Sequence, residues 1–459
     1  MKDTHREMDW LASRSAPRFS RRRLLSGLWN AAQGAVLVPM GGAGLRAPQE
    51  ASTASGRDTD SLPALSPPDE QFLDEIERAA FRFFWEQSSA ETGLVKDRAR
   101  ASGGPDPRPV ASIAATGFGL TAICIGAERG YVTRAEARQR TLATLKFVGD
   151  RLPHVHGFFY HFVDMHSGER VWNCELSSID SALLLCGVIA CGEYFPEPEI
   201  RRRAAQIYER VDWNWMRNGE RTLSMGWFPD KGFLAARWDT YCELMMIYLL
   251  GLGSPTHPLP AETWEAWSRP RFDYKGIRYI NSQTPLFTHQ YSHAWFDFRH
   301  KRDHYADYFE NSVLATKAHR RFCLDLHEKF PDYSADLWGI SASDSAQGYV
   351  AWGGPPPQGP IDGTLVPCAP GGSIPFLPVE TIEVLRTMRR RFGDKIWKRY
   401  GFVDAFNPLT GWYDPDVIGI DLGITLLMAE NARTQLVWRT FMKNEAAQRG
   451  MARASLRRA

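Results

Sequence analysis

The chain has 459 residues, of which 44% are hydrophobic, and this is ample for a large buried core. Its 55 basic and 53 acidic side chains nearly balance. Residues 1–47 hold eight basic and three acidic side chains, a net charge of +5, which leaves −3 for residues 48–459. A near-neutral body lacks the basic surface that nucleic-acid binding requires. We therefore expect no nucleic acid among the partners.

The N-terminal residues 1–47 have the pattern of a twin-arginine export signal. SRRRLL (20–25) precedes a weakly apolar stretch that runs to Ala47. A disordered basic tail is the alternative interpretation. Residues 48–68 are rich in Pro, Ser and Ala and predict a disordered linker. No stretch has the roughly 20 apolar residues needed to span a bilayer, so we expect a periplasmic or secreted protein without stable membrane insertion.

Seven cysteines are present, and none of them forms a C-x-x-C pair. Most lie in apolar helical surroundings, where a free cysteine behaves as a small hydrophobic residue. We therefore expect buried thiols, with no zinc site, while one bridge, Cys174–Cys186 or Cys186–Cys191, remains an alternative. The full set is Cys124, Cys174, Cys186, Cys191, Cys242, Cys323 and Cys368.

Residues 69–442 predict a single all-α domain of about twelve helices. Helices that are apolar all round alternate with helices that have one apolar face, which indicates buried helices covered by outer ones. Six inner and six outer helices in alternation predict an (α/α)6 toroid with a central cleft. The predicted helices are 69–89, 112–130, 134–152, 174–192, 198–213, 240–252, 261–269, 288–297, 305–329, 342–347, 378–392 and 420–442.

Strand patterns are sparse in this domain. GFFYHFVD (157–164) and GIRYINS (276–282) predict short strands within loops. Residues 443–459 predict a short basic C-terminal tail. There is no glycine-rich phosphate loop and no βαβ pattern, so we expect no cofactor.

Three acids stand at the starts of predicted inner helices, far apart in the chain: Glu175, Glu243 and Asp421. In a toroid whose inner helices run in the same direction, these starts converge on one rim. Aromatic residues, among them Trp172 and Trp238, accompany the acids. Each acid alone is also explained by helix capping. The three together, with the aromatic residues, favour a carbohydrate cleft.

Glycoside hydrolysis needs a protonated acid to protonate the leaving oxygen and a carboxylate that activates water or attacks carbon. A helix N-terminus stabilises a carboxylate and lowers its pKa, so the general acid needs burial to offset that effect. Glu243 is followed by LMMIYLL, which makes it the best candidate for burial.

Polar side chains elsewhere are candidates for contacting a sugar. FTHQYSHAWFDFRHKRD (287–303) is dense in such groups, and GFVDAFNP (401–408) carries Asp404 and Asn407. His289 and His293 are spaced like half a zinc site, but Gln290 replaces the glutamate of H-E-x-x-H, so we expect no metal. The predicted substrate-binding residues are Trp172, Asp180, His161, Trp238, Asp239, Tyr241, His289, Gln290, Tyr291, Trp295, Arg299, Asp344 and Asn407.

Seven motifs, spread over residues 69–442, resemble the glycoamylase-like family, which includes the endo-β-1,2-glucanases of glycoside hydrolase family 144. A related domain occurs in cyclic β-1,2-glucan synthases. The motifs are SIAATGFGLTA (112–122), HGFFYHFVDM (156–165), VWNCELSSIDSALLL (171–185), RWDTYCELMMIYLLGLGSPTHPLP (237–260), FTHQYSHAWFDFR (287–299), YFENSVLAT (308–316) and GFVDAFNP (401–408).

The resemblance implies an (α/α)6 barrel with a central cleft, and it assigns roles to the three acids. Glu243 becomes the general acid and Asp421 the general base, which in related enzymes acts through a substrate hydroxyl. Glu175 supports the network or exchanges roles with Asp421. The chain departs from the family pattern beside these acids, at Cys174, Cys242, Leu422 and Ile424, so the groups next to the substrate differ there.

We therefore expect a secreted, monomeric glycoside hydrolase that cleaves β-1,2-glucan in an endo, inverting manner. One alternative is a transglycosylase on the same polymer, which excess oligosaccharide acceptor would reveal through longer products. A second is a polysaccharide lyase, for which Arg237 and Arg299 could bind a uronic acid. A third is a glucan-binding protein without catalytic activity.

Overall fold

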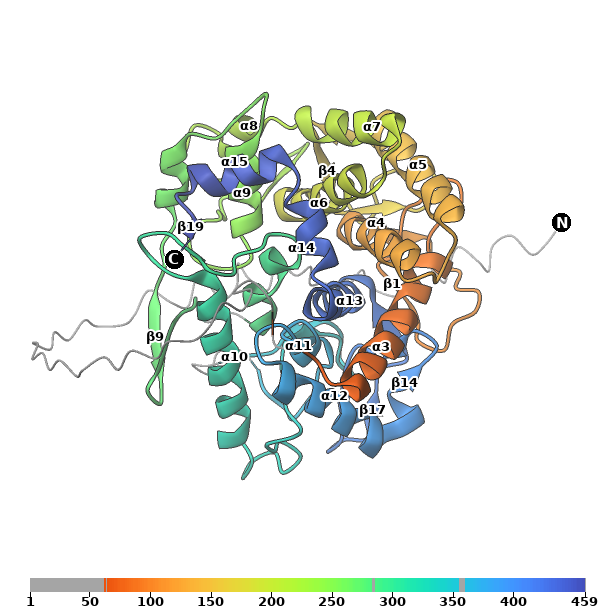
Figure 1. Ribbon diagram of the computed structural model, residues 1–459, viewed down its shortest axis with the longest axis vertical. Coiled ribbons are helices and arrows are strands. Elements are labelled where there is room, and N and C mark those ends of the chain that lie inside the picture. The colour runs from red at the N-terminus through yellow and green to blue at the C-terminus, as the bar shows by residue number, and fades with distance from the viewer. Residues whose placement is uncertain (1–61, 63, 283–284, 355–359, 459) are drawn as a thin grey trace, which may run out of the picture.

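The computed structural model describes residues 62, 64–282, 285–354 and 360–458 (Figure 1). The predicted export signal and residues 48–61 and 63 of the predicted linker lie outside the described residues, and the last two residues of the predicted linker belong to α3. The α-helices are α3 (Pro67–Glu86), α4 (Ile113–Glu128), α5 (Arg134–Asp150), α6 (Ser178–Tyr194), α7 (Pro198–Glu209), α8 (Trp213–Arg217), α9 (Met245–Gly253), α10 (Tyr308–Asp325), α11 (Cys368–Gly371), α12 (Pro378–Phe392), α13 (Gly419–Arg433), α14 (Leu436–Phe441) and α15 (Glu445–Arg453).

Four helices are buried on almost every side: α4, α6, α9 and α13. All nine residues of α9 are buried, as are fifteen of the seventeen residues of α6. Helix α4 packs between α6 and α13. These are segments that the sequence predicts to be apolar all round, because a helix without a polar face is stable in water only when other elements cover it.

Amphipathic helices cover these four from outside (Figure 1). Helix α3 packs on α13 and α4 and buries Phe72, Ile76 and Phe83 on one face. Its start is defined by Ser66, whose side chain accepts a hydrogen bond from the backbone of Asp69, and by a proline in its first turn. Helices α5 and α7 pack against each other, and α7 also packs on α6.

Two glycines allow α4 and α6 to lie in close contact. A Cβ atom on Gly117 would lie 2.2 Å from the carbonyl oxygen of Leu183, and one on Gly187 would lie 2.1 Å from that of Gly117. Both distances are shorter than any real carbon–oxygen contact. The small residues are therefore required by packing, and the two backbones approach each other directly.

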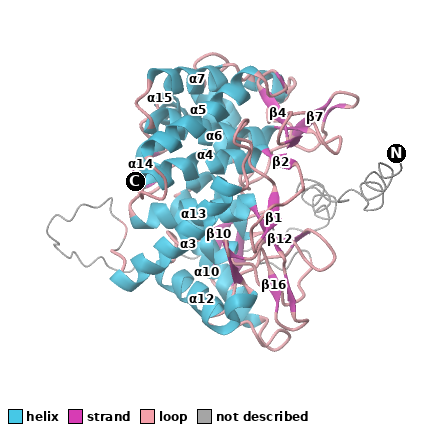
Figure 2. Ribbon diagram, turned by 90° about the vertical axis from the view of Figure 1, so that its right-hand side faces the viewer, coloured by secondary structure: helices cyan, strands magenta, loops and turns pink. Residues whose placement is uncertain are grey.

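The strands are short and gather on one side of the helices (Figure 2). The largest sheet has the order β3-β4-β6-β7-β8, and the others are antiparallel pairs. The strands are β1 (Arg98–Arg100), β2 (Val110–Ser112), β3 (His154–Val155), β4 (Phe158–Tyr160), β5 (Phe162–Asp164), β6 (Leu176–Ser177), β7 (Gly226–Phe228), β8 (Gly232–Phe233), β9 (Arg271–Tyr274), β10 (Ile277–Ile280), β11 (Lys301–Arg302), β12 (Ala342–Ser343), β13 (Val350–Ala351), β14 (Trp397–Lys398), β15 (Gly401–Phe402), β16 (Phe406–Asn407), β17 (Trp412–Tyr413), β18 (Asp416–Ile418) and β19 (Arg457–Arg458).

Three predicted helices are not α-helices in the structure. Residues 261–269 form the 3₁₀ helix η1 (Ala261–Ala266), and 288–297 fall into two 3₁₀ turns, η2 (Leu286–His289) and η3 (Tyr291–Ala294). The segment 342–347 holds strand β12 and a turn instead of a helix. A further short 3₁₀ turn, η4 (Gly393–Lys395), follows α12. The two predicted strand segments are confirmed, because β4, β5 and β10 lie within them.

The segment predicted to be a basic tail is folded, which corrects that interpretation. Asn444 caps α15 by accepting hydrogen bonds from two backbone N–H groups, and α15 packs on α9. Arg449 and Arg453 donate to the carbonyl oxygens of Gly253 and Leu252 at the end of α9. These contacts satisfy carbonyl groups that a helix end leaves without partners.

All seven cysteines are buried and unbridged, as the sequence predicts. The Sγ atoms of Cys124 and Cys191 lie 3.5 Å apart at the contact between α4 and α6. None of the described helices is long and apolar enough to cross a membrane.

Candidate active site

The three predicted acids lie where strands lead into the buried helices. Strand β6 runs directly into α6 and β18 into α13, so the starts of these helices lie on the face where the strands gather (Figure 2). Glu175 comes just before β6, Glu243 just before α9, and Asp421 in the first turn of α13. All three are buried, with exposed fractions of 5%, 1% and 6%.

Glu175 belongs to a buried group that we call the Glu175 cluster, made of His161, Glu175 and Asp180. His161 Nδ1 lies 3.1 Å from a Glu175 oxygen, and His161 Nε2 lies 3.5 Å from a carboxylate oxygen of Asp180. The backbone N–H of His161 also donates to the carbonyl of Glu175 at 3.0 Å. The predicted residues His161 and Asp180 are therefore brought together with Glu175, and the imidazole holds both carboxylates in place.

The backbone around Glu243 is held in place by Ser292. The hydroxyl of Ser292 in η3 donates to the Glu243 carbonyl at 2.9 Å and accepts from the N–H of Met246 at 3.1 Å. The neighbouring Cys242 thiol hydrogen-bonds to the Glu243 carboxyl, and burial, followed by the charge of Glu243, holds the pKa of that thiol well above its usual value. Cys242 is thus a neutral, protonated neighbour of the acid.

Asp421 is connected to the same 3₁₀ turn. The hydroxyl of Tyr291, which is 1% exposed, donates to Asp421 Oδ1 at 3.4 Å. Tyr291 and Ser292 are consecutive in η3, so one rigid turn contacts the side chain of Asp421 and the backbone of Glu243. The structure therefore brings the start of α13 and the start of α9 together through residues 291–292.

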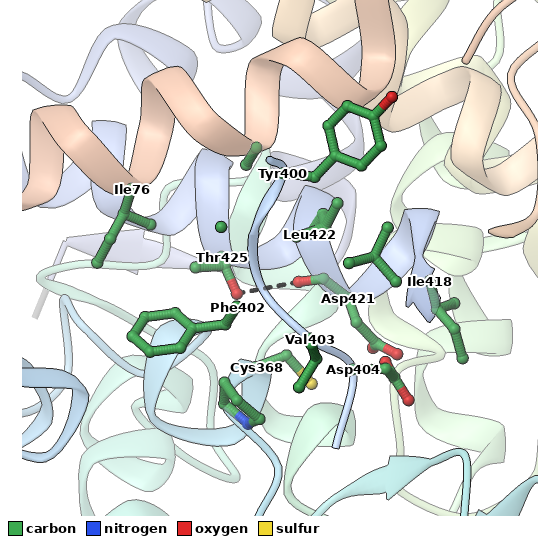
Figure 3. Close-up of a pocket in the computed structure, with 14 residues that line it drawn as sticks. Ile76, Cys368, Tyr400, Phe402, Val403, Asp404, Ile418, Asp421, Leu422 and Thr425 are labelled. Atoms are coloured by element: carbon green, nitrogen blue, oxygen red, sulfur yellow. Dashed lines mark hydrogen bonds between the residues drawn. The ribbon is translucent and has the colours of Figure 1, made fainter. Parts of the chain in front are cut away.

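A fourth acid, Asp404, lies beside Asp421; its motif GFVDAFNP (401–408) is a candidate for contacting a sugar, but Asp404 is not among the predicted site residues. The two carboxyl groups lie next to each other (Figure 3). Asp404 Oδ2 also accepts from the backbone N–H of Asp344 at 2.8 Å. Burial, followed by the charges of Asp421, Asp344 and Asp414, raises the pKa of Asp404 well above its usual value. The signal in the sequence is an acid within the apolar run GFVDAF (401–406).

Asp404 is part of a second buried group, the Asp404 cluster, made of Asp344, Asp404 and Asp414. Burial, followed by the charge of Asp344, raises the pKa of Asp414 to about 7, and burial also raises that of Asp344. The Arg98 guanidinium donates to Asp97 at 2.8 Å and to Asp344. Asp344, predicted to bind substrate, therefore forms an ion pair at the edge of this cluster.

Comparison with known proteins identifies the family. A family model described as "Putative glucoamylase" matches residues 235–445. A solved structure from Bacteroides uniformis ATCC 8492, also described as a putative glucoamylase, is 31% identical to this chain, with a TM-score of 0.78. The alignment covers 85% of this chain and 97% of that one. The chain belongs to the glycoamylase family.

Two further proteins that are similar to this chain have named activities. An endo-β-1,2-glucanase from Chitinophaga pinensis, solved with sophorotriose and glucose, is 27% identical, with a TM-score of 0.77 and coverage of 86% of this chain and 99% of that one. An exo β-1,2-glucooligosaccharide sophorohydrolase (non-reducing end) from Parabacteroides distasonis is 29% identical over 425 residues, which is 83% of this chain. This chain spans 57% of the length of that curated relative.

Trp172 is the predicted aromatic residue that reaches solvent in this family member. It is 47% exposed and packs edge-on against Phe162, with ring centroids 5.0 Å apart. Trp172 and Asn173 have φ angles of 56° and 47°, a left-handed conformation that costs a tryptophan about 1–2 kcal/mol. Arg170 holds the loop by donating to the carbonyls of Asn173 and Cys174, each at 2.6 Å. The loop therefore holds Trp172 in a strained backbone conformation that leaves its indole ring exposed to solvent.

Trp238, Tyr241 and His289 lie in the interior, and sugar contact by these residues stays a prediction. Trp238 and Tyr241 are 0% exposed. Trp238 donates to the Ser178 hydroxyl at the start of α6 at 2.8 Å, and Tyr241 lies 3.0 Å from His289 Nδ1. Burial lowers the pKa of His289 to about 3, so its ring is neutral. These residues support the site from behind.

Trp295 and Arg299 lie away from the acids, which also corrects their prediction. Trp295 donates to the Thr121 hydroxyl in the middle of α4 at 3.0 Å. Arg299 donates to Gln435, which follows the last turn of α13, at 3.0 Å. Asp421 is in the first turn of the same helix, about 20 Å away at 1.5 Å per residue. The chain from 291 to 299 therefore runs from the site to the opposite end of the helices.

Three other predicted residues have local structural partners. Gln290 is buried and donates to the Ala369 carbonyl at 2.8 Å. Asn407 is buried and caps a turn by accepting from the N–H of Leu409 at 3.0 Å. Asp239 is half-buried, and this burial raises its pKa. Of these three residues, Asp239 is the one that is partly exposed to solvent, as a residue that contacts substrate must be.

Both clusters have ligand-type atoms that lie within 4.8 Å of one another, the spacing of a metal site. In the Glu175 cluster, however, each imidazole nitrogen already faces a carboxylate. Beside the Asp404 cluster, the Arg98 guanidinium supplies a positive charge. We explain both as hydrogen-bonded networks of this chain and assign no metal to either.

A small cavity lies behind the Asp404–Asp421 pair, toward α3. Its volume is about 20 Å³, and its lining includes both aspartates, Thr425, Ile76 and Ala80. Ligand pockets usually enclose about 300–1,000 Å³. The cavity is therefore too small for a sugar ring.

Proposed function

We propose that this protein is a glycoside hydrolase that cleaves β-1,2-glucan by carboxylate acid–base catalysis. The observation that carries the proposal is that η3 joins two buried acids from separate helix starts, since Tyr291 donates to the Asp421 carboxylate and Ser292 to the backbone carbonyl of Glu243. Two similar proteins with named activities, an endo-β-1,2-glucanase from C. pinensis and an exo β-1,2-glucooligosaccharide sophorohydrolase from P. distasonis, support this linkage.

In the proposed mechanism, Glu243 is the general acid and Asp421 the general base. Burial of Glu243 favours its protonated form and so suits it to protonate the glycosidic oxygen. Asp421, which accepts a hydrogen bond from Tyr291, would activate water for attack on the opposite face of the sugar, with inversion. Glu175, fixed by His161, would position the substrate or the water between them.

We also propose that the helices form an (α/α)6 toroid. The buried helices α4, α6, α9 and α13 and the amphipathic helices around them support this arrangement. In it, Trp172 stands at the rim and stacks on a glucose ring, as exposed aromatic residues do. An experimental structure with a β-1,2-linked oligosaccharide would test both statements.

The test of function is product analysis. The full chain would be incubated with linear β-1,2-glucan, with β-1,3- and β-1,4-glucans as controls. Short oligosaccharides from the β-1,2 polymer alone support the proposal, and longer products formed in the presence of excess acceptor would indicate transglycosylation. If no polymer releases sugar, the proposed hydrolase function fails.

A second candidate is exo action that releases disaccharides, since the P. distasonis relative is a sophorohydrolase at the non-reducing end. Time courses separate the two modes. Endo cleavage gives a ladder of oligosaccharides early in the reaction, whereas exo cleavage gives sophorose alone from the first time point.

We further propose that residues 1–47 export the folded protein as a monomer to the periplasm or the exterior. SRRRLL (20–25), followed by a weakly apolar stretch, supports this. Replacing Arg22 and Arg23 together with Lys should retain the protein in the cytoplasm, as measured by cell fractionation. Light scattering of the exported protein tests the oligomeric state.

A further inference from the structure

Two buried thiols meet where α4 and α6 pack side by side (Figure 1). Cys124 lies near the end of α4 and Cys191 near the end of α6, and their Sγ atoms are 3.5 Å apart. The exposed fractions of the two residues are 4% and 0%. The thiol of Cys191 also donates to the carbonyl of Leu120 in α4 at 3.2 Å. The two sulfur atoms are therefore in contact, although the residues are 67 positions apart in the chain.

The register of α4 against α6 produces this contact. A Cβ atom added to Gly117 would lie 2.7 Å from the Cα atom of Leu184, so these two residues face each other across the helix contact. Cys124 follows Gly117 by seven residues, and Cys191 follows Leu184 by seven. Seven residues complete about two helical turns, so both cysteines return to the contact face. The offset is the same at both points, which shows that the helices run in the same direction and that their packing fixes the thiol contact.

Position rules out the two bridges that the sequence leaves open. Cys186 and Cys191 lie on the same helix, five residues apart, so their side chains project about 140° from each other around its axis. Cys174 precedes α6, and its thiol bonds to the backbone N–H and carbonyl of Phe162, each at 3.3 Å. Cys186 is about 12 Å along α6 from the first residue of that helix, whereas the Cα atoms of a disulfide lie within about 7 Å of each other. Neither bridge forms without a rearrangement of the backbone.

Closing the contact between Cys124 and Cys191 into a bond requires little movement. The S–S bond of a disulfide is about 2.05 Å long, so the two sulfur atoms have to approach by roughly 1.5 Å. The Sγ of Cys124 also lies 3.5 Å from the Leu120 carbonyl, which accepts an N–H bond within α4 as well. This oxygen therefore keeps a partner when the thiols lose their protons. The Thr141 hydroxyl, 3.9 Å from Cys191 Sγ, is a neutral neighbour.

The burial of the pair decides when such a bond forms. Burial, followed by the hydrogen bond to Cys191, holds the pKa of the Cys124 thiol well above its usual value. A buried thiol that stays protonated reacts slowly, because the thiolate is the attacking species and because an external oxidant has to reach it. The bond therefore forms while the chain is folding, when α4 and α6 come together and the thiols are still accessible.

We propose that Cys124 and Cys191 are joined by a disulfide when the chain folds under oxidising conditions, and that this bond ties α4 to α6. The oxidant is a small disulfide of the glutathione type. The thiolate of one cysteine attacks it, forms a mixed disulfide and releases one small thiol. The thiolate of the other cysteine then attacks the protein sulfur of the mixed disulfide and releases the second small thiol. The two protein thiols lose two hydrogens in total, and the oxidant gains them as it is reduced to two thiols.

The bond lies away from the proposed active site. Asp180 of the Glu175 cluster is in the first turn of α6, and Cys191 follows eleven residues later, roughly 16 Å along the helix. The bond closes a loop of 67 positions and restricts the unfolded chain, which stabilises the folded state. It also resists a separation of α4 and α6, the two helices whose backbones are already in contact at Gly117.

The test is to let the full chain fold in an oxidising and, in parallel, in a reducing bacterial cytoplasm. Free thiols of the two purified preparations are alkylated in denaturant, and peptides are identified by mass spectrometry. We expect the oxidised preparation to be lighter by two hydrogens before alkylation and to give a linked peptide pair that contains Cys124 and Cys191. The other five of the seven cysteines should be alkylated. Seven alkylated thiols in the oxidised preparation, or a bridge between other cysteines, would overturn the proposal.

Two serine variants locate the bond. Cys124→Ser should remove the linked peptide pair, and the mass difference between the two preparations should disappear. Cys186→Ser is the matched control, because Cys186 is also fully buried on α6 but projects from another side of the helix, and this variant should keep the bridge. The peptide map of wild type decides the question by itself if Cys124→Ser does not fold.

Thermal unfolding gives a readout that does not depend on peptide mapping. The oxidised preparation of wild type should melt a few degrees above the reduced preparation, since the cross-link restricts its unfolded chain. Cys186→Ser should show the same difference and Cys124→Ser none. If the bridge is present but the two wild-type preparations melt at the same temperature, the bond does not tie the helices together, and that part of the proposal is wrong.

Discussion

Glu243 faces two opposing electrostatic effects. It precedes α9, where the helix dipole favours a carboxylate, yet it is 1% exposed, which favours the neutral acid. The Cys242 thiol beside it is neutral and supplies no countercharge. Glu243 must stay protonated to serve as the proposed general acid, so the effect of burial has to outweigh that of the helix dipole.

Removing either acid should abolish most of the turnover. We expect Glu243→Gln and Asp421→Asn each to lower kcat by about 10²–10⁴, because each substitution removes one proton-transfer group. The melting temperature should change little, since both replacements keep the shape of the side chain. Glu328→Gln, at an exposed position in the loop after α10, is the control and should keep the wild-type rate. A wild-type kcat in either site variant would refute that role.

Trp172 offers a test of substrate binding. We expect Trp172→Gly to raise KM by roughly tenfold with kcat nearly unchanged, because a stacking platform is lost while the acids stay in place. Glycine accepts the φ of 56°, so the free energy of unfolding should not fall. Trp172→Tyr, which keeps an aromatic face, should retain most of the affinity. A lower kcat with constant KM would contradict the platform role.

At the scale of the elements, the contact between α4 and α6 depends on the absence of side chains. Gly117 and Gly187 place the two backbones against each other, and the start of α6 carries Asp180 of the Glu175 cluster. Any separation of the two helices therefore moves part of the site. Helix packing and acid geometry are linked through this contact.

We expect Gly117→Ala to lower the free energy of unfolding by about 1–3 kcal/mol or more, since the new methyl group has no space beside Leu183. Gly149→Ala in α5 is the matched control. Its Cβ would meet Ile207 at 3.6 Å, an ordinary contact, so the higher helix propensity of alanine should stabilise the protein slightly. Urea unfolding measures the stability of both variants. If Gly117→Ala were as stable as wild type, α4 and α6 could separate without a loss of free energy.

At the scale of the whole molecule, the C-terminal segment completes the packing around a buried helix. Helix α15 covers α9, and its Met451 is 4% exposed. Because α9 follows Glu243 directly, the last residues of the chain support the proposed general acid from behind. The basic residues of this segment are explained by bonds to helix-end carbonyls as well as by solvent exposure.

Truncation after Lys443 should therefore destabilise the protein. We expect a loss of about 2–4 kcal/mol in the free energy of unfolding, from the exposed surface under Met451 and the lost arginine bonds. Removing only residues 457–459 should have a small effect, because β19 is exposed. Thermal unfolding compares the three forms. An unchanged stability after the longer truncation would mean that the segment is only a tail.

Local sequence determined much of this protein. The apolar runs predict α4, α6, α9 and α13 because a helix without a polar face must be covered, and capping and breaking residues set most helix ends within a few residues. The same pattern places Glu175, Glu243 and Asp421 at the starts of buried helices. The glycoamylase-like motifs predict the family that the comparisons identify.

Only the tertiary structure decided which distant residues meet. Asp404 and Asp421 are 17 positions apart with a strand pair between them, so no local periodicity connects their carboxyl groups. The sequence predicts Arg299 to bind sugar, but in the structure the chain after η3 runs to the far end of α13, where Arg299 binds Gln435. Residues 445–453 read as a basic tail until α9 supplies the surface that α15 covers. In each case the deciding free energy comes from long-range contacts, which local composition does not encode.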